Sequence, residues 1–146
     1  MRTFTAFVSD GEISDIGRGM LERTLPKPRW THAAHFAAAA WLLRCRQDMD
    51  IVREMPDMIR AYNAATGVAN SDTGGYHETI TQASIRATRA FLSEHSQLAL
   101  HAAVNELLRS PLGQPEWLLK YWSRERLFSV EARKYWVEPD LAPLPF

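Results

Sequence analysis

The chain has 146 residues, which is enough for one domain with a single substantial hydrophobic core. Apolar residues make up 46% of it and charged residues 23%, as in ordinary globular proteins. Seventeen basic residues balance seventeen acidic ones, so the net charge is zero. The charge therefore gives no argument for nucleic acid or an anionic membrane surface as a partner.

Cys45 is the only cysteine, which excludes an intrachain disulfide and a multi-cysteine zinc site. The first ten residues lack the apolar core of a signal peptide, and the longest apolar run is too short to span a bilayer. We therefore expect a cytoplasmic protein.

Hydrophobic spacing and capping residues predict an all-α, single-domain bundle of four to five main helices. In chain order we expect an extended arm at 1–9, helices at 10–24, 30–43, from Asp48 or Asp50 to Gly67, 76–92 and 97–109, short helices at 115–122 and 130–136, and an irregular, proline-rich tail at 137–146. Gly17 weakens the first helix, and Pro56 is expected to kink or restart the third.

The most apolar stretch is the predicted helix at 30–43, in which every residue from Ala33 to Leu43 except His35 is apolar. A helix that is apolar on all sides belongs in the middle of a bundle. Thr31 is a suitable N-cap, which places His32 and His35 on one face of the first turn. We expect both imidazoles to point inward.

A second polar group in an apolar setting is the run Tyr76-His77-Glu78-Thr79. If it meets the first, His32, His35 and His77 form a site for a divalent metal such as zinc, iron or manganese, with an open position for water. Glu78 then serves as a ligand or general base, and the substrate is a small polar or anionic molecule. The pattern His-Glu-x-x-His of zinc proteases is not present, because Thr81 stands where its second histidine would be.

Two readings without a metal remain open. In one, the histidines are hydrogen-bonded core residues, and Thr81, Ser84 and Thr88 bond the carbonyls one turn earlier. In the other, the same helix lines a metal-free pocket for a small ligand, with Tyr76, Thr81 and Ser84 in contact with it.

The segment 120–128 combines aromatic and basic residues. Arg124 and Arg126 are candidates to bind a carboxylate or phosphate of the small ligand. The aromatic residues fit single-stranded nucleic acid less well than a packing cluster, because the chain is neutral and Glu125 lies between the arginines. A third hypothesis makes exposed tryptophans between Trp117 and Trp136 the interface of a homodimer.

The motifs Trp30-Thr31-His32-x-x-His35 and Gly75-Tyr76-His77-Glu78-Thr79-x-Thr81 resemble those of a small bacterial protein family. The similarity extends from about Leu25 to Leu141. This family brings no known activity, cofactor or partner, so the resemblance implies none.

Overall fold

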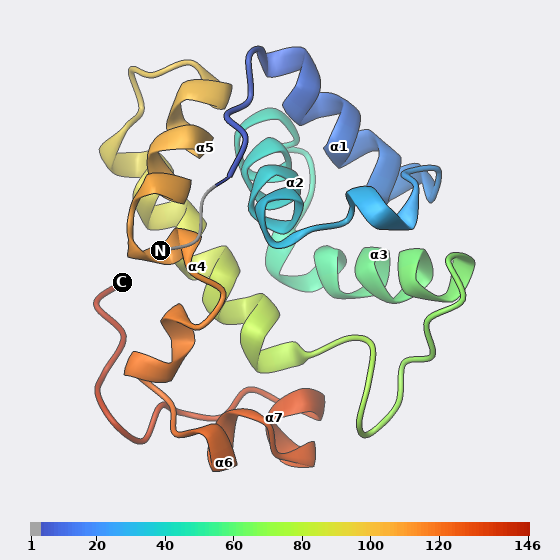
Figure 1. Cartoon of the computed structure of the whole chain (residues 1–146), viewed down its shortest axis with the longest axis vertical. Helices are drawn as coiled ribbons and strands as arrows, with labels where there is room; N and C mark the ends of the chain where they lie inside the picture. The colour runs from blue at the N-terminus through green and yellow to red at the C-terminus, as the bar shows by residue number, and fades with distance from the viewer. Residues whose placement is uncertain (1–3) are drawn as a thin grey trace.

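The structure is a computed structural model and describes residues 4–146. All regular structure in this range is helical, which confirms the predicted all-α fold. The five longer helices are α1 (Asp10–Glu22), α2 (His32–Cys45), α3 (Ile51–Ala65), α4 (Glu78–Glu94) and α5 (Leu100–Arg109). Figure 1 shows α2 between α1 and α5, with α3 and α4 below it.

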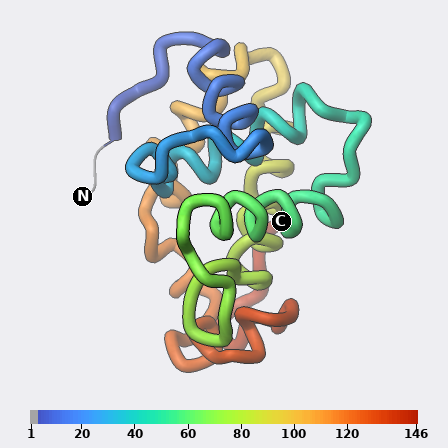
Figure 2. Tube along the Cα trace, turned by 90° about the vertical axis from the view of Figure 1, so that its right-hand side faces the viewer, coloured from blue at the N-terminus to red at the C-terminus, as the bar shows by residue number. Residues whose placement is uncertain are grey.

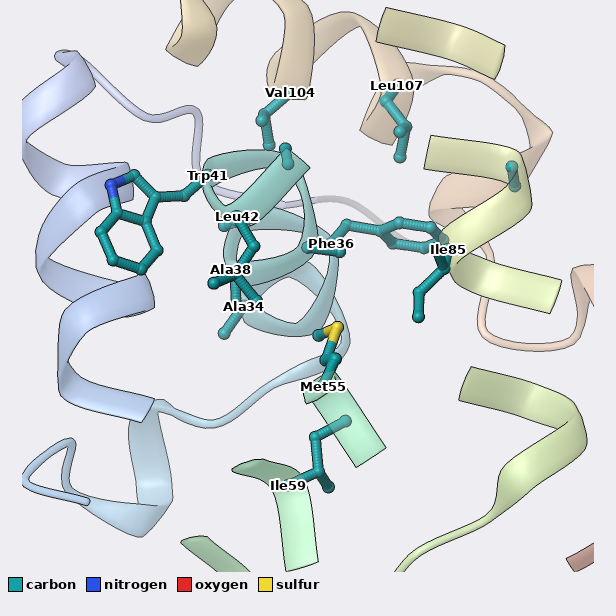
Figure 3. Packing of buried hydrophobic residues seen from close by; sticks show 14 of the residues in the cluster. Ala34, Phe36, Ala38, Trp41, Leu42, Met55, Ile59, Ile85, Val104 and Leu107 are labelled. Atoms are coloured by element: carbon teal, nitrogen blue, oxygen red, sulfur yellow. The ribbon is translucent and has the colours of Figure 1, made fainter. Parts of the chain in front are cut away.

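Helix α2 is the centre of the core. The Thr31 hydroxyl accepts a hydrogen bond from the N–H of Ala34 at 3.2 Å, which confirms the predicted N-cap. The helix is buried on every side from Phe36 to Leu42. In Figure 3 its Trp41 points toward α1 and its Phe36 toward Ile85 of α4. Small alanines elsewhere on the helix let neighbours approach closely.

The contact between α1 and α2 requires a glycine. A Cβ atom added at Gly17 would lie 2.3 Å from Cε3 of Trp41, far inside van der Waals contact. The indole therefore packs directly on the bare backbone of α1. The residue that weakens helix α1 locally is the one that permits its packing.

Helix α3 continues through Pro56, so the predicted restart does not occur. A proline inside a helix leaves the carbonyl four residues earlier without its N–H partner. That carbonyl belongs to Val52, and the side-chain amide of Gln82 in α4 donates to it at 3.0 Å. The two helices are thereby joined at the proline.

The C-terminal part forms short helices at one end of the molecule, beside the loop that joins α3 to α4 (Figure 2). They are 3₁₀ turns at Pro111–Gly113 and Trp117–Lys120, then α6 (Arg124–Leu127) and α7 (Val130–Lys134). The turn at Trp117–Lys120 replaces the predicted helix at 115–122, and α6 was not predicted. Residues 137–146 contain no helix, as expected, and Leu141 N–H donates to Tyr121 O at 2.9 Å.

The aromatic residues of this region mostly pack inside. Trp117 and Trp122 are 4% and 0% exposed, and the Trp122 indole donates to Val137 O at 3.0 Å. The exposed tryptophans that the homodimer hypothesis required are therefore not found at these two positions. Phe128 is exposed.

Residues 4–9 precede α1 without regular structure, and the first three residues of the predicted arm lie outside the described range. The side chain of Asn105 holds this segment by bonding both the N–H and the carbonyl of Phe7, each at 2.9 Å. Within residues 4–146 no helix has the length and apolar character needed to cross a membrane.

We expect Gly17→Ala to lower the free energy of unfolding by about 1–3 kcal/mol, because the new methyl group overlaps the Trp41 ring. Gly11→Ala is the matched control in the same helix, where a Cβ meets only Ser9 Oγ at 3.5 Å. This control should change stability by less than about 1 kcal/mol and in the favourable direction. Urea unfolding of the two variants measures the difference, and equal effects would contradict the packing argument.

We expect Gln82→Met to lower the free energy of unfolding by about 1–2 kcal/mol, because the Val52 carbonyl loses its donor. In a Pro56→Ala background the loss should be smaller, since the restored backbone N–H bonds that carbonyl. A double-mutant cycle measures this coupling. Gln47→Met, at an exposed glutamine, is the control. Additive effects of the two changes would show that the amide does not compensate for the proline.

Candidate functional site

A cavity of about 460 Å³ lies between the start of α2, α3, the first half of α4 and residues 115–128. Its volume is in the range of small-ligand sites. Its walls are mainly apolar, from Phe36, Ile59, Ile80, Ile85, Trp117, Leu118 and Leu127. Its polar side chains are His32, His35, Thr81, Ser84, Glu116 and Arg124. Five of these six were predicted as site residues, and Glu116 was not.

His35 lies in the cavity wall with one ring nitrogen occupied. Its Nδ1 donates to Thr31 O at 2.7 Å, and its ring lies 3.9 Å from the ring of Trp30. Because a carbonyl only accepts, the neutral ring has its proton on Nδ1 and its acceptor lone pair on Nε2. The side chain lines the cavity and is exposed to water. Desolvation by the neighbouring protein atoms lowers the pKa of His35 to about 4, so the ring is neutral at pH 7.

His32 lies between this cavity and a second one near the N-terminal segment. Its Nε2 donates to Leu112 O at 3.1 Å, and its ring meets Phe36 edge-on. Both histidines of α2 thus line cavities at the edge of the hydrophobic core. The prediction that they point into the interior is only partly met, because His32 is half-buried and His35 is exposed.

His77 is buried, and both of its ring nitrogens bond to the backbone. Nδ1 accepts from Ile80 N–H at 3.1 Å, so the imidazole is the N-cap of α4. Nε2 donates to Leu127 O at 2.8 Å and thereby ties α6 to α4. Burial, and to a lesser extent the nearby charge of Arg133, lower the pKa of His77. The neutral ring is needed here, because a protonated Nδ1 cannot accept the capping bond.

The structure does not gather the three predicted metal ligands. Over residues 4–146 no group of three or more His, Cys, Asp or Glu side chains is arranged to hold a metal ion. His77 is not in the wall of the cavity that His32 and His35 share. A metal on its ring would displace either the cap of α4 or the bond to Leu127.

Tyr76 and Glu78 form a pair beside the cavity and are not in its wall. The buried Tyr76 hydroxyl donates to Glu78 Oε1 at 2.5 Å, and burial followed by this carboxylate raises the pKa of Tyr76. Glu78 itself lies in a separate outer depression. It is therefore not placed to act as a general base in the cavity.

The hydroxyl side chains of Thr81, Ser84 and Thr88 form a stripe along α4, and this stripe divides between the two roles predicted for these residues. Thr88 is fully buried and donates to Ser84 O at 2.7 Å, one turn earlier. Thr81 and Ser84 are half-buried and line the cavity. The stripe is therefore a packing feature at its C-terminal end and a cavity wall at its N-terminal end.

The two candidate arginines, Arg124 and Arg126, have different positions and different partners. Arg124 lines the cavity and is exposed, and in the described range it forms no ion pair. Arg126 donates from Nε to Glu138 O at 2.6 Å and holds the tail. Only Arg124 is positioned to meet a ligand in the cavity.

The walls contributed by residues 115–119 were missed from the sequence as parts of a site. A short 3₁₀ turn has no amphipathic period to reveal its inner face. Trp117 did give a signal, as a large apolar side chain near a proline, but this predicts burial and not a cavity.

Comparison of the chain with protein-family models, curated proteins and solved structures gives no match. The function is therefore argued from the site alone.

We expect His77→Ala to lower the free energy of unfolding by about 2 kcal/mol, because it removes a cap and a buried hydrogen bond. His77→Asn retains a capping oxygen but is too short for Leu127 O, so about half of the loss should be recovered. Denaturant unfolding at pH 7.5 measures both.

The same histidine makes stability depend on pH. Its pKa is lowered in the folded state, so between about pH 6.5 and that lowered value only the unfolded chain binds the proton. Stability should be highest above pH 6.5 and fall as the pH decreases. His35 also has a lowered pKa, so it too makes stability fall as the pH decreases from about 6.5 to about 4. His77→Asn should reduce the slope and leave the contribution of His35. An unchanged slope would show that His77 is not kept neutral.

Proposed function

We propose that the protein binds a small amphipathic anion, with an apolar body and one carboxylate-like group, in the cavity formed by α2, α3, α4 and residues 115–128. The observation that supports this most directly is an apolar enclosure with Arg124 at its edge, because this arginine forms no ion pair among residues 4–146. Apolar walls with a few placed polar groups are typical of small-molecule sites.

The apolar walls supply affinity and the polar groups supply orientation. Phe36, Ile85 and Trp117 offer a surface for an aliphatic or aromatic body. The Arg124 guanidinium matches a carboxylate in shape and charge. A charged group on the ligand is best placed near this exposed end, because a buried unpaired charge is costly.

The neutral imidazole of His35 adds a second polar feature. Its Nε2 is an acceptor, and the hydroxyl of Ser84 is both donor and acceptor. These two groups suit a hydroxyl or amide N–H on the ligand. Because His35 is neutral at pH 7, the positive charge in the cavity wall comes from Arg124.

The proposal requires no metal. A zinc, iron or manganese ion on His32, His35 and His77 is not proposed, because both nitrogens of His77 bond to the backbone away from the cavity. No reaction is proposed either, since Glu78 lies outside the cavity wall.

We expect octanoate to bind more tightly than octan-1-ol, because only the anion pairs with Arg124. Arg124→Gln should weaken octanoate by roughly threefold to tenfold and leave octanol unchanged. Glu116→Gln should strengthen octanoate binding, because it removes a negative charge that repels the octanoate carboxylate from the same wall of the cavity. Chemical-shift titration of isotope-labelled protein measures all of these affinities.

Two variants test whether binding occurs in the cavity at all. Ser84→Phe places a ring in the cavity and should abolish binding of both probes while circular dichroism remains helical. Arg89→Gln removes an exposed charge of α4 outside the cavity wall and should have no effect. Equal loss of octanoate affinity in Arg89→Gln and Arg124→Gln would refute the assigned role of Arg124.

A further inference from the structure

A depression of about 600 Å³ on the outer side of α3 and α4 brings three arginines together. Arg53 and Arg60 come from α3, two turns apart and therefore on one face of the helix. Arg86 comes from α4, and Trp136 of the C-terminal segment forms a further part of the wall. Glu78 is the one carboxylate in this lining.

The base of the depression joins the two helices. Gln82 donates to the Val52 carbonyl that Pro56 leaves without a helical partner, and all three residues are in its wall. The arginines therefore extend from two helices that are bonded to each other at this point. A ligand need not bring the helices together.

Among residues 4–146, one of the three arginines of the depression forms an ion pair and two do not. Arg60 pairs with Asp57 at 3.1 Å and lies 4.3 Å from the ring centre of Tyr76. The Arg86 guanidinium lies 4.1 Å from the ring centre of Trp136. In the part of the chain that the structure describes, neither Arg53 nor Arg86 forms an ion pair.

The carboxylate of Glu78 does not pair with the arginines of the depression, so it does not block them from binding an anion. Its carboxylate accepts the Tyr76 hydroxyl at 2.5 Å, and among residues 4–146 it has no ion pair with an arginine. Two further carboxylates bond to residues of the lining, Asp57 to Arg60 and Glu138 to the indole N–H of Trp136. The guanidinium groups of Arg53 and Arg86 have no ion pair within residues 4–146 and can bind an anion with more than one negative charge.

We propose that this depression binds a phosphate group. Guanidinium forks match the oxygens of a phosphate, and several arginines together suit a dianion better than a single carboxylate. The stacking of Arg86 on Trp136 holds that guanidinium in place and reduces the entropy lost on binding. The phosphate comes either from inorganic phosphate and pyrophosphate or from a phosphorylated small molecule.

The test is a chemical-shift titration with inorganic phosphate, pyrophosphate and phenyl phosphate at low ionic strength. We expect saturable shifts at Arg53, Arg86 and Trp136, with pyrophosphate tighter than phosphate and both weakened by added salt. Phenyl phosphate tighter than phosphate would identify a phosphorylated organic ligand, and equal affinity would identify the free ion. Absence of saturation with millimolar pyrophosphate overturns the proposal.

Variants assign the binding to the arginines. Arg53→Gln and Arg86→Gln should each weaken pyrophosphate by about threefold to tenfold. Arg86→Lys retains the charge but not the fork, so its loss should be intermediate. The matched control is Arg89→Gln, an exposed arginine one turn along α4 that is not in the lining. Melting temperatures identify any variant that is unfolded, and an equal loss in Arg89→Gln overturns the assignment.

Discussion

The close packing of helix α2 against its neighbours is the constraint on which the rest of the structure depends. Its alanines present little side chain, so α1 and α5 approach its backbone closely. The large indole of Trp41 is accommodated against α1 because position 17 is a glycine. With α2 enclosed in this way, its less buried residues lie at its two ends, and the first turn contains His32 and His35.

The start of α4 has the corresponding role for the C-terminal segment. His77 holds Leu127, and the Thr79 hydroxyl donates to Tyr135 O at 2.8 Å. The Arg133 guanidinium of α7 donates to Gly75 O at 3.0 Å, just before the helix. These bonds hold the short C-terminal helices α6 and α7 against the start of α4. The cavity exists because they are held there.

The two proposed sites lie on different sides of the first turns of α4. Thr81 lines the cavity and Glu78 lines the arginine-rich depression, where its carboxylate accepts from the Tyr76 hydroxyl. Within the described range every buried side-chain nitrogen and oxygen has a partner, as a stable core requires.

The sequence was sufficient to predict the helical class, the central position of the Trp30 stretch, the N-cap at Thr31 and a start of α3 at Asp48 or Asp50, because periodicity and capping are local properties. It also identified polar residues that line the cavity, among them His35, Ser84 and Arg124. The folded chain was needed to see that His77 is a cap, that Gln82 compensates for Pro56 and that Arg126 holds the tail. These roles depend on partners distant in the chain, and no local pattern specifies the direction in which a side chain finds them.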